Sequence, residues 1–108
     1  MSFPLQEGEK IVADVMANLF RGFEGVGGRL KVTDSRLLFE PHNFNFQTMT
    51  LEIPLSQVEQ VQPRNTWGIV PNGILVKLKS GVEYKFVVWK RQTLVATIEG
   101  LMRAGKTA

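Results

Sequence analysis

Five basic residues stand within fifteen positions of one another in the second half of the chain: Lys77, Lys79, Lys85, Lys90 and Arg91. Only one acid, Glu83, lies among them. Such a cluster could bind an anionic membrane lipid or an acidic peptide. At roughly 1 kcal/mol per basic residue near an anionic bilayer, a net charge of four gives about 4 kcal/mol, which is millimolar binding. A membrane function therefore needs a second contribution, from a headgroup pocket or from inserted apolar side chains.

Apolar side chains that could make this contribution lie in two predicted loops. The stretch RNTWGIVPNG (64–73) carries Trp67, whose ring we expect to be exposed, while Ile69 and Val70 fold inward. The stretch EPHNFNFQ (40–47) carries Phe44 and Phe46. For Phe44 and Phe46 the alternative to membrane insertion is that they fold back on the mouth of the barrel or meet another subunit, and we favour this alternative. For Trp67 the alternative, packing against the barrel, has nearly equal support.

Residues that could support catalysis are few. The chain has no cysteine, and His42 has no second histidine as a partner for zinc binding or nucleophilic catalysis. The acids are scattered singly, and the glycines at 22, 25, 27 and 28 match neither a P-loop nor a dinucleotide-binding motif. The sequence therefore predicts a protein that is not an enzyme and that needs neither a metal nor a cofactor.

Length and charge narrow the class of protein further. A chain of 108 residues is one domain, which we place over residues 1–108. Residues 1–62 have a charge balance of −3 and residues 63–108 a balance of +6, which favours an anionic partner for the second half. The first residues do not resemble a secretory signal, and no apolar run could span a bilayer. We expect a cytoplasmic protein that can lie at the periphery of a membrane.

Alternating apolar and polar residues predict strands over most of the chain. Ile11, Ala13, Val15, Ala17 and Leu19 recur with a period of two, which is typical of a half-buried strand. The stretch RGFEGVGG (21–28) is expected to be a loop. After it, 28–33 and 36–40 form a tight hairpin, because pairing Val32 with Leu37 and Leu30 with Phe39 puts all four on one face. A short strand ending at Pro54, a corner over 54–57 and a strand over 58–62 follow.

The clearest hairpin is GILVKLKSGVEYKFVV (73–88). A two-residue turn would mix its apolar and polar faces. A three-residue loop over 79–81, with Gly81 at positive φ, pairs Leu78 with Val82 and Val76 with Tyr84, and it separates the faces. The period then changes to that of an amphipathic helix over about 91–103, with a frayed tail at 104–108.

In all, about seven strands over 9–89 precede one C-terminal helix. Because the strand aromatics Phe39, Tyr84 and Phe86 point to the core face, no platform for stacking bases is evident. Nucleic acid is therefore not an expected partner, and the sequence pI of about 9.5 does not change this.

This order of elements, together with four stretches, resembles the GRAM domain of the pleckstrin-homology-like (PH-like) superfamily. The stretches are GGRLKVTDSRLLFEPH (27–42), LEIPLSQVEQV (51–61), NTWGIVPNGILV (65–76) and YKFVV (84–88). The resemblance implies a partly open barrel of seven antiparallel strands capped by the helix. It also implies a binding module for membrane lipids or for proteins at membranes. The alternative function is a protein-interaction or homo-oligomerisation module without affinity for lipid.

Overall fold

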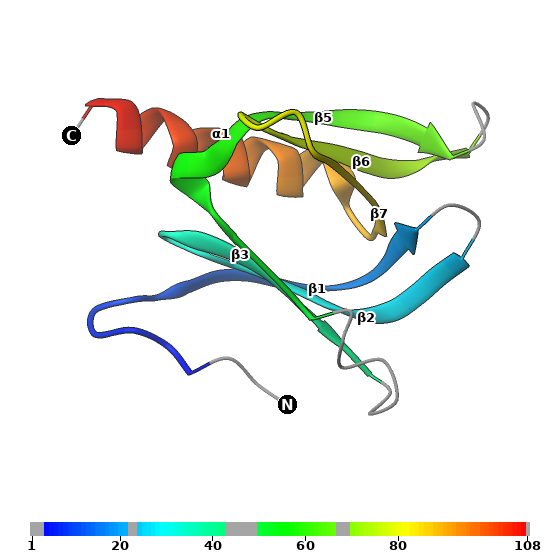
Figure 1. Ribbon diagram of the computed structural model, residues 1–108, viewed down its shortest axis with the longest axis horizontal. Helices are drawn as coiled ribbons and strands as arrows, with labels where there is room; N and C mark the ends of the chain where they lie inside the picture. Colours follow the sequence, from blue (N-terminus) through cyan, green and yellow to red (C-terminus); the bar gives the residue numbers. More distant parts are fainter. Residues whose placement is uncertain (1–3, 22–23, 43–49, 67–69, 108) are drawn as a thin grey trace.

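The fold is taken from a computed structural model that describes residues 4–21, 24–42, 50–66 and 70–107. The proposed contact residues Phe44, Phe46 and Trp67 lie outside these ranges, and so does Ile69. Seven antiparallel strands precede one helix (Figure 1). The elements are β1 (Ile11–Arg21), β2 (Glu24–Thr33), β3 (Arg36–Pro41), β4 (Leu51–Pro54), a 3₁₀ turn (Leu55–Gln57), β5 (Val58–Thr66), β6 (Val70–Leu78), β7 (Glu83–Val88) and α1 (Arg91–Thr107).

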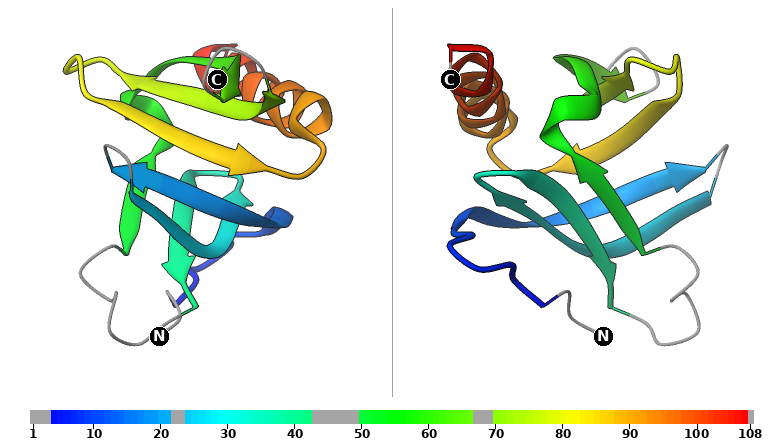
Figure 2. Two further views of the ribbon diagram at one scale, coloured as in Figure 1. Left: turned by 90° about the vertical axis from the view of Figure 1, so that its right-hand side faces the viewer. Right: turned by 60° about the vertical axis from the view of Figure 1, so that its left-hand side comes forward.

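The strands form one sheet in the order β4-β3-β2-β1-β7-β6-β5, which bends over itself without closing. The layer made by β1–β4 crosses beneath the layer made by β5–β7, and α1 lies on the side of the second layer (Figures 1 and 2). The helix packs against β5, β6 and the 3₁₀ turn. The predicted fold class, a partly open barrel with a C-terminal helix, is confirmed.

The core fills the space between the two layers. Phe39 of β3 and Phe86 of β7 meet there with their ring centroids 5.9 Å apart, in a tilted arrangement that aromatic pairs prefer. The helix adds Leu94 and Ile98, both buried, from the apolar stripe that the sequence predicted. Each layer thus buries one face of its strands against the other.

Both predicted hairpin registers are confirmed. Val32 pairs with Leu37 and Leu30 with Phe39 in the β2–β3 hairpin. In the β6–β7 hairpin Val76 pairs with Tyr84, and the Leu78 N–H donates to the Val82 carbonyl at 2.8 Å. The turn between the two strands spans Lys79, Ser80 and Gly81, as predicted from the separation of the apolar and polar faces of the hairpin.

Gly81 has a φ of +95°, a conformation that side chains with a Cβ rarely adopt. We therefore expect Gly81→Val to lower the free energy of unfolding by about 1 kcal/mol or more. Urea denaturation of the two proteins measures this difference. An unchanged midpoint would contradict it, and Ser80→Val, at a position without positive φ, is the matched control.

Four expectations about boundaries and burial are wrong. The predicted loop over 64–73 is mostly strand, since β5 runs to Thr66 and β6 begins at Val70. Most of the predicted loop over 21–28 likewise belongs to β1 and β2, and α1 continues to Thr107 instead of ending near 103. Pro63 did not end β5 because β5 is an edge strand, where a missing N–H is tolerated. Ile11 is 45% exposed because the register shifts between Ile11 and Ala13.

Candidate functional site

The structure divides the five predicted anion-binding residues into two groups. Lys77 of β6 and Lys85 of β7 project from the outer face of their hairpin, and Lys79 lies in the turn that joins the two strands. Lys77 lies across from Glu83 and is 3.7 Å from a Glu59 carboxylate oxygen. Within the described residues, Lys79 and Lys85 are exposed and form no ion pair.

The second group lies at the other end of β7. Lys90 is exposed and has a φ of +55°, which turns the chain out of β7 and into α1. Arg91 donates hydrogen bonds to the carbonyl oxygens of Arg64 and Gly73 and to Asn65 Oδ1, at 3.0, 3.5 and 3.2 Å. Its guanidinium therefore ties the helix to β5 and β6. Lys85 and Lys90 are five residues apart along the chain, which is about 16 Å of extended strand.

An exposed apolar side chain accompanies the first group. Val82 follows the turn and is 46% exposed. We call Lys77, Lys79, Val82 and Lys85 the lysine hairpin. Lys79 and Val82 lie at its tip, whereas Lys77 and Lys85 lie on its outer face, opposite to the face that Val82 shares with Leu78. The role of these lysines in binding stays a prediction.

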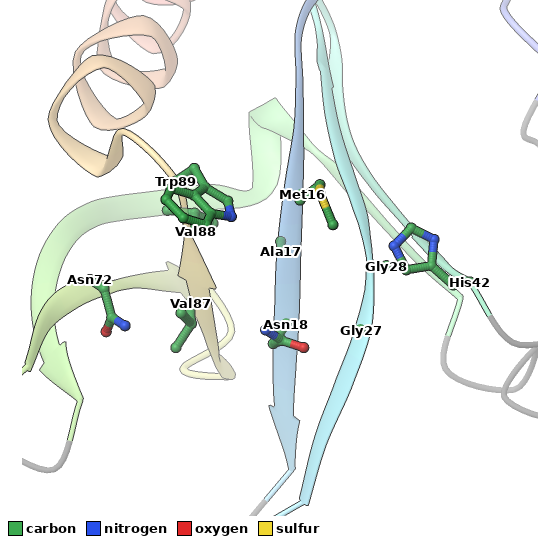
Figure 3. Close-up of a pocket in the computed structure, with 10 residues that line it drawn as sticks. All are labelled: Met16, Ala17, Asn18, Gly27, Gly28, His42, Asn72, Val87, Val88 and Trp89. Carbon is green, nitrogen blue, oxygen red and sulfur yellow. The ribbon is translucent and has the colours of Figure 1, made fainter.

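A hollow of about 300 Å³ lies on the outer face where β1 and β7 meet (Figure 3). Trp89, 73% exposed, and Met16, 52% exposed, stand at its rim. We call it the Trp89 hollow. The other residues that line it are Ala17, Asn18, Gly27, Gly28, His42, Asn72, Val87 and Val88.

Trp89 is not among the contact residues predicted from the sequence, although the sequence carries a signal for it. The residues of the predicted strand YKFVV (84–88) alternate between the two faces of the sheet. Trp89 comes directly after this strand and directly before the basic pair Lys90 and Arg91. Tryptophan is enriched at interfaces, because its ring is apolar and its N–H can meet a polar partner.

His42, the single histidine, lines the Trp89 hollow, and its backbone N–H donates to the Gly27 carbonyl at 3.0 Å. Two ion pairs lie on the same sheet, Arg29 with Asp14 and Lys31 with Glu40, each at 2.7 Å. In the described part of the chain, no three His, Asp or Glu side chains are grouped so that they could hold a metal ion.

The most perturbed ionisable groups lie on another side of the fold. Arg36 Nε and Nη2 donate to the two carboxylate oxygens of Glu9, each at 2.7 Å, and Nη1 donates to Glu52 at 2.7 Å. Thr33 and Ser35 also donate to Glu9, at 2.6 and 3.1 Å, and Arg36 Nη2 donates to the Pro4 carbonyl at 2.8 Å. We call this set the Arg36 network. It holds residues 4–9 against the β2–β3 hairpin.

The Arg36 network strongly shifts the pKa values of Glu9 and of Arg36. The Arg36 guanidinium, helped by the Thr33 hydroxyl, holds the pKa of Glu9 far below its usual range. The Glu9 and Glu52 carboxylates in turn raise the pKa of Arg36. Perturbed groups can mark a functional site. Here the donors of Arg36, Thr33 and Ser35 are already paired with acceptors within the fold, so we assign the network a structural role.

Comparison with known proteins identifies the family. A family model described as "GRAM domain" matches residues 1–103. A search of curated proteins gives no match. No helix among the described residues is long and apolar enough to cross a membrane.

Solved structures share the fold at low sequence identity. The Vps36 N-terminal PH domain has a TM-score of 0.77 at 16% identity, covering 97% of this chain and 87% of that one. The C-terminal domain of an unknown protein from Leishmania infantum has a TM-score of 0.77 at 14% identity, covering 89% and 86%. A linker-DH/PH fragment of p115-RhoGEF has a TM-score of 0.74 at 13% identity, covering 92% of this chain and 30% of that one.

Proposed function

The chain belongs to the GRAM domain family, and from this premise we propose that it is a non-catalytic binding module that docks on an anionic membrane surface through the lysine hairpin. The observation that carries the proposal is the exposed Val82 at the tip of a hairpin that also carries Lys77, Lys79 and Lys85. We further propose that the protein is cytoplasmic and peripheral at the membrane. An acidic peptide is the alternative ligand for the same lysines.

The energetics favour a weak, salt-dependent contact. Three lysines reduced by the charge of Glu83 give a net of two, or about 2 kcal/mol near an anionic bilayer. Insertion of Val82, already about half exposed, adds up to about 2 kcal/mol. The sum corresponds to millimolar binding by one domain, so attachment would strengthen when several copies meet the same surface.

The double variant Lys77→Glu/Lys85→Glu is therefore expected to abolish co-sedimentation with vesicles rich in phosphatidylserine, while its thermal melting stays near that of the wild type. Wild-type binding should fall steeply between low and physiological salt, because exposed charges are screened over about 8 Å at physiological ionic strength. Val82→Ser should weaken binding without changing the charge.

The matched control is Lys10→Glu/Arg103→Glu, which makes the same change in net charge at two exposed positions outside the lysine hairpin. If this control loses as much binding as Lys77→Glu/Lys85→Glu, the attraction comes from net charge and not from the hairpin. Wild-type protein that fails to bind vesicles at any salt, yet binds a poly-glutamate peptide, would assign the lysines to an acidic peptide.

A second candidate function is a protein-interaction or homo-oligomerisation module. The observation that favours it is the exposed apolar surface around the Trp89 hollow, which lies apart from the lysine hairpin and includes Met16 and Trp89. Exposed tryptophan and methionine are enriched in protein interfaces. Light scattering tests the homo-oligomer directly, and a monomer at high concentration would exclude it.

A further inference from the structure

The outer face of the short contact between β1 and β7 follows from its register. The two strands pair only from Ala17 to Phe20, and the pairs Ala17–Val88 and Leu19–Phe86 are buried in the core. Because successive strand residues point to opposite faces, the residues that alternate with these four point outward. We call this outward-facing set the Trp89 face, which consists of Met16, Asn18 and Phe20 of β1, Lys85 and Val87 of β7, and Trp89, which follows β7.

The most exposed apolar side chains of the Trp89 face lie at one of its ends. The register of the two strands, continued past Val88, places Trp89 across from Met16, and both line the Trp89 hollow (Figure 3). Trp89 is the most exposed of the large apolar side chains that the structure describes, and Met16 is also exposed. Half-buried Val87 continues this surface along β7 toward Lys85. The surface lies outside the core, so packing within the described part of the fold does not account for it.

Two exposed lysines flank this apolar surface. Lys85 stands on the same face, four residues before Trp89, which is about 13 Å of strand. Lys90 follows Trp89 directly and lines a neighbouring hollow with it, where the chain turns into α1. Neither lysine forms an ion pair with another described residue. An anionic bilayer attracts such cations and buries the apolar surface between them.

The acids of β1 and β7 lie beside other cations. Asp14 of β1 is paired with Arg29 at 2.7 Å, and Glu83 of β7 lies across from Lys77. Two copies related by a twofold axis would present the same face to each other, so the two flanking lysines would enter the contact from both sides. Buried charges without partners are costly, and protein interfaces are depleted in lysine. The charges of the Trp89 face therefore favour an anionic lipid surface over a second copy.

We propose that the Trp89 face lies against an anionic membrane, with the side chains of Trp89 and Met16 inserted among the lipid headgroups and with Lys85 and Lys90 on lipid phosphates. A tryptophan ring suits this level of a bilayer, because it is apolar and its N–H can meet a polar partner. The inference rests on the proposed membrane function and adds to it a contact surface beyond the tip of the lysine hairpin. Inserted Trp89 and Met16 supply the apolar contribution that the lysines need for attachment.

Tryptophan fluorescence tests this contact directly. The chain has two tryptophans, so Trp67→Phe leaves Trp89 as the only one. With vesicles of phosphatidylcholine and phosphatidylserine, we expect the Trp89 emission to shift to shorter wavelength and to be quenched by brominated lipid. Vesicles of phosphatidylcholine alone should cause neither change, because they do not attract Lys85 and Lys90.

Co-sedimentation with the same vesicles measures the contribution of each side chain. We expect Trp89→Ala to weaken binding by about tenfold or more and Met16→Ser to weaken it by about threefold, since each removes apolar surface that the membrane would bury. The matched control is Leu5→Ser, because Leu5 is 47% exposed but lies on the N-terminal segment, outside the Trp89 face. Leu5→Ser should bind as the wild type does, and thermal melting should show that all three variants fold.

The possible outcomes separate this inference from the membrane function itself. If the wild type binds vesicles but the Trp89 emission does not shift, or if Trp89→Ala binds as tightly as the wild type, the inference is wrong and the membrane function stands. If the wild type binds no vesicles at any salt concentration, both are wrong. A wild-type dimer that Trp89→Ala converts to a monomer would also overturn the inference, because the Trp89 face would then hold a second copy.

Discussion

A Gly28→Ala variant is expected to be about 3 kcal/mol less stable to unfolding than the wild type. Gly28 lies in β2, where an added Cβ would overlap the carbonyl oxygen of Glu40 and approach Phe39 Cζ to 2.8 Å. The first is backbone of the neighbouring strand, and the second is a fully buried ring of the core. Neither can move without disturbing the β2–β3 ladder, and overpacking of this kind costs about 1–3 kcal/mol or more.

Urea denaturation measures this difference, and Gly100→Ala in α1 is the matched control. An added Cβ at Gly100 would meet only the end of the Arg103 side chain, at 3.9 Å. Since alanine is the better helix former, Gly100→Ala should raise stability by about 0.5–1 kcal/mol. The steric explanation fails if Gly28→Ala unfolds at the same urea concentration as the wild type.

Replacing Arg36 with leucine is expected to cost about 3 kcal/mol of stability. Removal of one partner from a buried ion pair costs about 3–5 kcal/mol, since the remaining charge is left without compensation. The Arg36 side chain is 8% exposed and that of Glu9 is 2% exposed, whereas that of Glu52 is 43% exposed. We therefore expect the lower end of that range, because Glu52 can turn to water.

The same network predicts how stability depends on pH. Because the folded state lowers the pKa of Glu9, the stabilisation is complete above the unfolded pKa of about 4.3 and is lost as pH falls below it. In Arg36→Leu this acid-induced loss should shrink, because the main cause of the shift is gone. The experiment is a series of urea titrations from neutral pH to about pH 3.

A double variant separates charge from packing in this series. Glu9→Gln/Arg36→Leu removes the uncompensated carboxylate and should be more stable than Arg36→Leu alone. If Arg36→Leu lowers the free energy of unfolding by less than about 1 kcal/mol, the Arg36 network does not stabilise the fold as its burial implies.

Local patterns predicted most of this fold. The hairpin registers followed from the requirement that apolar residues share a face, and both were confirmed, including the left-handed Gly81. The predicted loops are too long because glycine and proline usually break strands, and here they do not. Gly28 is instead required by the close approach of β3, and Pro63 is accommodated at an edge.

The candidate sites were harder to predict because they depend on contacts between distant residues. The cluster of basic residues was visible in the sequence, but a strand separates Lys79 from Lys90, and Arg91 binds backbone carbonyls. The Arg36 network joins residues 9, 36 and 52, whose spacing has no period that a pattern could detect. The Trp89 hollow likewise needs β1, β2, β6 and β7 to come together with His42, which follows β3.

The short contact between β1 and β7 also has a consequence for the folding pathway. Strands β2, β3 and β4, like β5, β6 and β7, pair with their sequence neighbours, so each group can form by local turns. The pairing of Ala17 with Val88 instead closes a loop that contains most of the chain, and the entropy of that closure must be overcome before the contacts compensate for it. We expect this pairing to form late, in the rate-limiting step of folding.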